Sequence, residues 1–185
     1  REQSCSIKSL TRDYLYKQLL SSGEYTFDHM LVIKDPYGEA PLTALALFIL
    51  EEPACVRVTT KGNLKETDFV TELPKKKEHR VPILGMYAEK ANDIVIEILD
   101  DEGNCVKSHT FTIRTKRLPK SLRNVITVKK WTDKPAYSNI MINGGVKIHT
   151  CVFDIEGQIR YYLSRKPRGY GICLLYTSDA ADEAR

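Results

Sequence analysis

The sequence predicts an all-β protein, in which an immunoglobulin-like antiparallel β-sandwich follows a short helix and precedes the start of a second β unit. Three observations support this fold class. Apolar or alternating segments recur at intervals of roughly ten residues from residue 24 onward, separated by Pro and Gly turns. Helical periodicity occurs only near the N-terminus. The chain has 185 residues, 42% hydrophobic and 28% charged, a composition typical of a packed globular core.

Residues 7–20 are predicted to form the helix. The residues that recur at helical spacing, and so define its expected apolar face, are Leu10, Tyr14, Leu15 and Leu19. Gly23 follows as a stop, because glycine readily adopts the conformation that ends a helix. We therefore assign residues 1–23 to an N-terminal helical segment.

Residues 24–117 are predicted to form the sandwich, and Leu42–Leu50 is its most apolar segment. This run is about half of the roughly 18 residues that a membrane span requires. Its abundant Ala and Leu and the preceding Pro41 would suit a helix. The strand rhythm around it instead favours a strand buried on both faces and closed by Glu51-Glu52-Pro53.

The neighbouring strands of the sandwich are more polar. The segment 25–33 alternates as far as Asp35-Pro36, and the segment 55–60 alternates as far as a Gly-containing turn. The segment 65–73 is polar and is predicted to be an edge strand. The basic stretch "PKKKEHR" at 74–80 lies between two prolines and is predicted to be a solvated loop.

The clearest hairpin pairs residues 93–99 with residues 105–115 across the turn "DDEGN" at 100–104. One face of its first strand carries Ile94, Ile96 and Ile98, and one face of its second carries Phe111 and Ile113.

The basic, Pro-containing segment "KRLPKSL" at 116–122 is a candidate domain boundary, and residues 118–172 are assigned to the second unit. After "NVITVKKW" and a loop around Pro135 and Ser138, a hairpin pairs residues 147–153 with residues 158–163 across Asp154–Gly157. Two such strands cannot close a core, so they are expected to begin a larger structure. Residues 173–185, "CLLYTSDAADEAR", resemble a translated sequencing adapter and are left out of the fold prediction.

No local motif predicts an active site, so we assign no catalytic, cofactor-binding or metal-binding residue. The four histidines, His29, His79, His109 and His149, have no partner at metal-ligand spacing. His109 shares a strand face with Phe111 and Ile113 and is predicted to be structural. The carboxylates Asp100, Asp101 and Glu102 lie at a hairpin tip, which places them in water, an environment that does not favour tuning a carboxyl group as a general acid. Gly144-Gly145 is predicted to be a turn.

The cysteines do not indicate a metal or redox site, because no C-x-x-C occurs. Cys55 and Cys105 have the separation of an immunoglobulin disulfide but no Trp between them, so their pairing is left open. The net charge of +4 is mildly basic, and no clustered basic face with aromatic residues predicts binding to nucleic acid. No membrane span is predicted. The chain starts at Arg1 with no apolar leader-like run, so the compartment is left open.

Two long motifs resemble the N-terminal domain of bacterial arylsulfate sulfotransferases. They are "DPYGEAPLTALALF" at 35–48 and "VPILGMYAEKANDIVIEILDDEGN" at 81–104, in which Met86 stands where the family more often has Leu. "FDIEGQIRYYL" at 153–163 is similar to the first propeller blade of that family, with an acidic-Gly turn followed by an Arg and paired aromatic residues. The resemblance covers roughly residues 27–172.

The resemblance implies a β-sandwich followed by a six-bladed β-propeller, of which this chain holds only the start. It implies transfer of a sulfuryl group from a phenolic sulfate ester to a phenol acceptor, through a sulfated histidine and without a nucleotide donor or other cofactor. The catalytic groups would come from later blades, so the fragment itself is expected to be inactive. The resemblance also implies a periplasmic or other extracytoplasmic location.

A second hypothesis stays open, that of a non-catalytic immunoglobulin-like binding or adhesion module, because a sandwich does not fix function. Within a parent enzyme the sandwich could cover the propeller, pair two protomers as a homodimer, or shape the substrate mouth.

Overall fold

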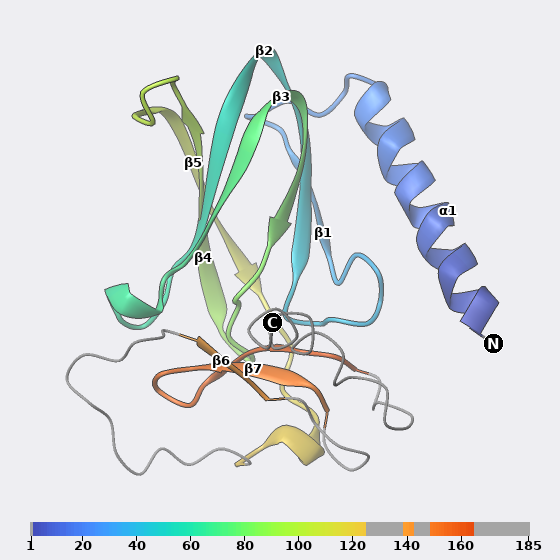
Figure 1. Ribbon diagram of the computed structural model, residues 1–185, viewed down its shortest axis with the longest axis vertical. Coiled ribbons are helices and arrows are strands. Elements are labelled where there is room, and N and C mark those ends of the chain that lie inside the picture. The colour runs from blue at the N-terminus through green and yellow to red at the C-terminus, as the bar shows by residue number, and fades with distance from the viewer. Residues whose placement is uncertain (1, 125–138, 143–148, 165–185) are drawn as a thin grey trace, which may run out of the picture.

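The computed structural model describes residues 2–124, 139–142 and 149–164 (Figure 1). An N-terminal helix lies along the outside of an antiparallel β-sandwich, and a smaller antiparallel sheet lies across one end of that sandwich (Figure 1). The elements in order are α1 (Glu2–Ser21), β1 (Leu31–Lys34), β2 (Ala44–Thr60), the 3-10 turn η1 (Lys65–Thr67), β3 (Phe69–Ile83), β4 (Ala91–Leu99), β5 (Cys105–Arg114), the 3-10 turn η2 (Lys120–Leu122), β6 (Asn139–Ile142), β7 (Cys151–Asp154) and β8 (Ile159–Tyr162). The predicted all-β fold with one helix is confirmed.

Strand β2 is the central strand of the sandwich and pairs with β1, β3 and β4. Its 17 residues pair with β3 along nearly their whole length, from Ala44 opposite Ile83 to Thr60 opposite Phe69. On its other side, β2 pairs first with β1 and then with β4, which in turn pairs with β5. One long bent strand thereby belongs to both halves of the sandwich, which explains how so few strands enclose a core.

The prediction that Glu51-Glu52-Pro53 closes a strand was wrong, because β2 continues through these residues. The register against β3 shifts between Ile49 and Ala54 and again between Ala54 and Val56. Pro53 lies within this irregular stretch, so its missing backbone N–H breaks no regular ladder position. The bulge bends the strand where the sequence predicted that the strand ends.

The prediction that residues 74–80 form a solvated loop was also wrong, since they belong to β3. Pro74 and Lys75 fall at the register shift of the β2–β3 pair, where a proline is tolerated. The side chains of Lys75, Lys76 and Lys77 are exposed, and among the described strands β3 pairs only with β2. The lysines therefore protect an edge strand from pairing with other chains. The predicted edge strand at 65–73 is confirmed from Phe69 onward, and its first three residues form η1 instead.

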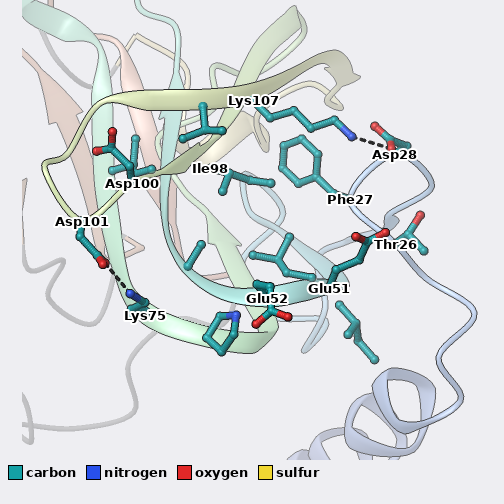
Figure 2. Close-up of a pocket in the computed structure, with 16 residues that line it drawn as sticks. Thr26, Phe27, Asp28, Glu51, Glu52, Lys75, Ile98, Asp100, Asp101 and Lys107 are labelled. Carbon is teal, nitrogen blue, oxygen red and sulfur yellow. Dashed lines mark hydrogen bonds and ion pairs between the residues drawn. The ribbon is translucent and has the colours of Figure 1, made fainter.

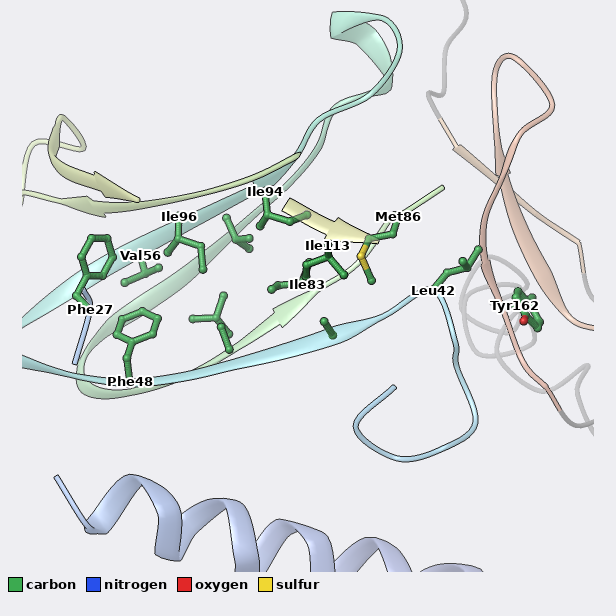
Figure 3. Packing of buried hydrophobic residues seen from close by; sticks show 14 of the residues in the cluster. Phe27, Leu42, Phe48, Val56, Ile83, Met86, Ile94, Ile96, Ile113 and Tyr162 are labelled. Carbon is green, nitrogen blue, oxygen red and sulfur yellow. The ribbon is translucent and has the colours of Figure 1, made fainter. Parts of the chain in front are cut away.

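The Leu42–Leu50 run is buried on both faces, as predicted. Ala44, Ala46 and Phe48 point into the sandwich, where the core continues through β4 and β5 (Figure 3). The alternate residues Leu45 and Leu47 point outward and are covered by α1.

The predicted apolar face of the helix was wrong in part. The side chains that α1 buries against Leu45 and Leu47 are those of Tyr16 and Leu20, whereas Tyr14 and Leu15 are 64% and 49% exposed. The helix also begins earlier than predicted, at Glu2. Within the described part of the chain, no helix has the length and apolar character needed to cross a membrane.

The segment Asp35–Gly38 forms the turn that was predicted before the apolar run. Gly38 donates its N–H to the carbonyl of Asp35 at 2.9 Å and has φ of 73°. The same turn anchors the helix, because Tyr16 Oη donates to the carbonyl of Pro36 at 2.5 Å and Tyr37 Oη donates to Asp13 Oδ1 at 2.7 Å. The most distinctive motif of the sequence thus holds α1 against the sandwich.

The β4–β5 hairpin and its turn are confirmed. Ile94 and Ile96 are fully buried, opposite Phe111 and His109 respectively. Gly103 donates to the carbonyl of Asp100 within the turn at 3.1 Å.

The second sheet has the order β6-β7-β8. The predicted hairpin is confirmed as β7 and β8 around the Asp154–Gly157 turn, and β6 was not predicted. The sheet lies against the sandwich at the end away from the β2–β3 bend (Figure 1). The predictions for residues 125–131, for the Pro135 and Ser138 loop, for Gly144-Gly145 and for 173–185 lie outside the described residues.

Candidate functional site at the junction of sandwich and second sheet

A single arginine from the second sheet is buried in the end of the sandwich. Arg160, on β8, is 1% exposed. Its Nε donates to the carbonyl of Gly85 at 2.7 Å, and its Nη1 lies 2.9 Å from the carbonyl of Thr67, from Tyr87 Oη and from Asp154 Oδ2. Three of these four acceptors belong to the sandwich and lie 73 to 93 residues away in the sequence.

Asp154 supplies the charge that balances Arg160. Its carboxylate is fully buried, and its Oδ1 also accepts the N–H groups of Glu156 and Gln158 at 3.0 Å each. Gly157 completes this turn with φ of 77°. One carboxylate thus closes the β7–β8 turn and holds the arginine, because a buried charge requires both a counter-ion and hydrogen bonds.

Tyr87 forms the sandwich side of the contact. The guanidinium carbon of Arg160 lies 3.8 Å from the centroid of the Tyr87 ring, a cation–π geometry. Asn92, which is 1% exposed, fixes the backbone of Tyr87 by accepting its N–H at 2.7 Å and donating to its carbonyl at 3.0 Å. Asn92 therefore holds the backbone of Tyr87, whose ring Arg160 packs on.

Gly85 is required by the geometry of the junction. It has φ of 74°, and a Cβ at this position would lie 2.6 Å from the Cβ of Phe69. Only glycine allows the chain to pass this close to Phe69 and present its carbonyl to Arg160.

The junction has further contacts on either side of the arginine. Asn63 donates its Nδ2 to Glu156 Oε2 at 3.1 Å, and Ser164 donates its N–H to the carbonyl of Glu39 at 2.7 Å. The apolar core is continuous across the junction and includes Leu42, Leu122, Cys151, Ile159 and Tyr162. Figure 3 shows Leu42 of the sandwich beside Tyr162 of β8.

One polar atom of the junction has no partner among the described residues. The Nη2 of Arg160 is buried and makes no hydrogen bond with them. The remaining donors of the side chain are all satisfied, so the arginine is held in one orientation.

The four histidines are on separate elements and do not form a common site. His29 is exposed in a turn before β1, and His109 lies on β5 with its ring 6.2 Å from Phe27. His79 is 2% exposed, is stacked on Phe48, and has its Nε2 2.9 Å from the carbonyl of Lys76. Burial lowers the pKa of His79 from its ordinary value. His149 is buried, with its Nδ1 2.7 Å from the carbonyl of Leu163.

Two carboxylates at the β4–β5 tip make structural contacts. Asp100 accepts hydrogen bonds from the backbone and side chain of Asn104, at 2.8 and 3.1 Å, which lower the pKa of Asp100. Asp101 forms an ion pair with Lys75. Among the residues that the structure describes, no group of three or more His, Cys, Asp or Glu side chains could hold a metal ion.

Cys55 and Cys105 are free thiols and not a disulfide. Both lie opposite Leu99 of β4, on β2 and β5 respectively, so a strand separates them. Cys151 is also free, and burial raises the pKa of its thiol.

Sequence reasoning found some residues of the junction and missed others. The Asp154–Gly157 turn and Arg160 were noted as a pattern, and Gly85 and Tyr87 lie inside a noted motif. The contact of Arg160 with Gly85 and Tyr87 was not predicted. An available signal was Arg160 itself, since a charged residue flanked by Ile159, Tyr161 and Tyr162 suggests a strand buried on both faces.

Comparison with known families gives one match. Residues 31–116 match the family model described as the arylsulfotransferase Ig-like domain. A comparison with curated proteins finds no match. The matched region runs from the first residue of β1 to just beyond the end of β5, and so includes the sandwich strands with Gly85 and Tyr87. Residues 31–116 of this chain are therefore similar to the immunoglobulin-like domain of arylsulfotransferases.

Proposed function

We propose that this chain is the N-terminal part of an arylsulfate sulfotransferase whose catalytic centre lies in a β-propeller that follows the sandwich. The family match of residues 31–116 is the observation that carries this proposal. The second sheet, β6-β7-β8, would be the first blade of that propeller, and an antiparallel sheet of consecutive strands is the unit from which propellers are built.

The proposed reaction transfers a sulfuryl group between two phenols in two steps. A neutral imidazole nitrogen attacks the sulfur of a phenolic sulfate ester, the S–O bond to the phenol breaks, and the phenolate leaves with a proton from an acid. The oxygen of a phenol acceptor then attacks the sulfur of the sulfated histidine while a base takes the phenolic proton, and the S–N bond breaks to restore the free imidazole. Cationic side chains around the sulfuryl oxygens would stabilise the charge in both transition states.

We assign none of these roles to a described residue of this chain. His79 and His149 are buried and bonded to backbone carbonyls, whereas His29 lies in the loop before β1 and His109 lies on β5. The proposed contribution of this chain is mechanical: it fixes the sandwich to the first blade. A free-standing adhesion module would not need an arginine from a following sheet buried in its end, which favours the enzyme.

The test uses 4-nitrophenyl sulfate as donor and phenol as acceptor. The 185-residue chain alone should release no nitrophenol above background. The same chain followed by a complete propeller should release nitrophenol in a phenol-dependent manner, with phenyl sulfate as the second product. Turnover by the chain alone would place the active site inside it and contradict our assignment.

The gene itself offers a second test. The residues that follow the second sheet in the full gene should show repeated four-strand patterns that carry several His and Arg residues. A continuation without such repeats, or with further sandwich domains, would exclude the transferase and favour the binding module.

A further inference from the structure

A cavity of about 550 Å³ lies between the bend of β2 and the β4–β5 hairpin (Figure 2). In the ribbon of Figure 1 these elements are at the end of the sandwich away from the second sheet. The walls of the cavity come from the loop before β1, from the bend of β2 and from the β4–β5 hairpin. It therefore lies at the opposite end of the sandwich from Arg160, and the proposed transferase function does not use it.

The inner wall of the cavity is apolar. Phe27, Leu50 and Leu99 line it and are themselves buried, and Ile98 continues the same surface. Val106 stands at the rim with 68% of its surface exposed. This wall offers an apolar ligand a surface to cover, and its volume lies in the range of small-molecule sites.

Two ion pairs flank the cavity and cancel its positive charges. The Nζ of Lys107 lies 2.7 Å from Asp28 Oδ2, between β5 and the loop before β1. On the other side, Lys75 of β3 pairs with Asp101 at the hairpin tip (Figure 2). Both lysines of the cavity thus already have a carboxylate partner.

The charge that remains is negative. Asp100 is occupied by hydrogen bonds within its own turn. Glu51 and Glu52, on the bend of β2, line the cavity and are exposed, and neither carboxylate forms a hydrogen bond or ion pair with the other described residues. Two unpaired carboxylates beside an apolar wall complement a ligand with one positive and one apolar end.

We propose that this cavity binds a small organic cation with an apolar body, of the arylalkylammonium class. The apolar body would cover Ile98, Leu50 and Val106, and the ammonium group would donate hydrogen bonds to Glu51 and Glu52. Charged hydrogen bonds of this kind are stronger than neutral ones. An anion of the same shape is repelled by the same carboxylates.

The experiment is an NMR titration of the 15N-labelled full chain with 2-phenylethylammonium, with 2-phenylethanol as the neutral isostere. The amine should bind saturably with a dissociation constant of about 1 mM or tighter, and should shift the amide signals of residues 49–54 and 98–107. The alcohol should bind roughly tenfold more weakly.

Two variants separate the carboxylates from the apolar wall. The double variant Glu51→Gln, Glu52→Gln should lose roughly tenfold in affinity for the amine and leave its affinity for the alcohol unchanged. Glu66→Gln, at an exposed residue of η1, is the matched control and should change neither affinity.

Several results would overturn the proposal. Equal affinities for amine and alcohol would reduce the cavity to an apolar hollow without selectivity for charge. Shifts confined to α1 or to the second sheet would place the binding elsewhere. Binding of a lysine-containing peptide in the cavity with no binding of the amine would make it a protein-docking surface.

Discussion

The guanidinium group of Arg160 packs on the ring of Tyr87, with 3.8 Å between the guanidinium carbon and the ring centroid, and also donates to the hydroxyl of that tyrosine at 2.9 Å. Arg160 lies on β8 of the second sheet, Tyr87 lies in the connection between β3 and β4 of the sandwich, and the two residues are 73 positions apart. The same side chain is bonded to Gly85, Thr67 and Asp154. This contact joins the family-matched sandwich to the sheet that follows it.

Replacing Arg160 by Gln should destabilise the chain strongly. The change leaves the Asp154 carboxylate buried without its counter-ion, and breaking a buried pair in this way costs about 3–5 kcal/mol. Arg160→Lys should cost less, because the charge stays, but it loses the planar fork and the stacking on Tyr87. Urea denaturation measures both. Lys107→Gln, at an exposed ion pair, is the control and should cost less than about 1 kcal/mol. Equal losses in the free energy of unfolding for Arg160→Gln and Lys107→Gln would mean that the buried ion pair stabilises the chain no more than the exposed one.

Gly85→Ala should destabilise more than Gly103→Ala. Both glycines have positive φ, 74° and 84°, so both substitutions introduce backbone strain of about 1–2 kcal/mol. Only at Gly85 does the new Cβ meet Phe69, and this overpacking should add about 1–3 kcal/mol. The space around Gly103 is open to 4 Å. Thermal denaturation of the two variants measures the difference, and equal stabilities would show that Phe69 moves aside freely.

Leu20→Ala and Leu15→Ala separate the buried face of α1 from its exposed face. Leu20 is 3% exposed and packs against Leu45 and Leu47, so its truncation should cost about 2–4 kcal/mol. Leu15 is 49% exposed, and its truncation should change the free energy of unfolding by no more than about 0.5 kcal/mol. A larger effect at Leu15 would mean that the helix packs with the face that periodicity predicted. Chemical denaturation of the two variants is sufficient.

His79 should make the free energy of unfolding fall as the pH drops below about 6.5. Burial lowers the folded-state pKa of His79 below its ordinary value of 6.5, so the unfolded chain binds the proton more readily. Stability is therefore fully present above pH 6.5 and falls as the pH drops below it, by at most about 1.4 kcal/mol per pH unit. His79→Gln should flatten this slope. A variant with the same slope as the unchanged chain would assign the dependence to another group. Urea midpoints at several pH values provide the measurement.

The sequence predicted those parts of the fold that depend only on residues close together in the chain. The β4–β5 hairpin follows from alternating Ile94, Ile96 and Ile98 and from the Gly103 turn, and all of that information lies within residues 93–115. The burial of Leu42–Leu50 on both faces followed from a run of apolar residues that only Thr43 interrupts. The Pro53 and Pro74 positions were misread, because each proline lies at a bulge that only the β2–β3 register reveals.

The junction could not be predicted because its parts are distant in the sequence. A lone arginine on a four-residue strand is ordinarily exposed, and nothing beside Arg160 indicates that Thr67 and Gly85 offer their carbonyls to it. The helix face was misassigned for a related reason. Tyr16 faces the sandwich because its hydroxyl group donates to the carbonyl of Pro36, 20 residues away, and helical periodicity does not reveal this partner.

Unfolding of the full chain followed by calorimetry tests the central claim most directly, namely that Arg160 makes the sandwich and the second sheet one cooperative unit. We predict a single transition for the unchanged chain, and for Arg160→Gln two separate transitions, with the second sheet unfolding first. Two transitions in the unchanged chain, or a single undisturbed transition in Arg160→Gln, would contradict the claim.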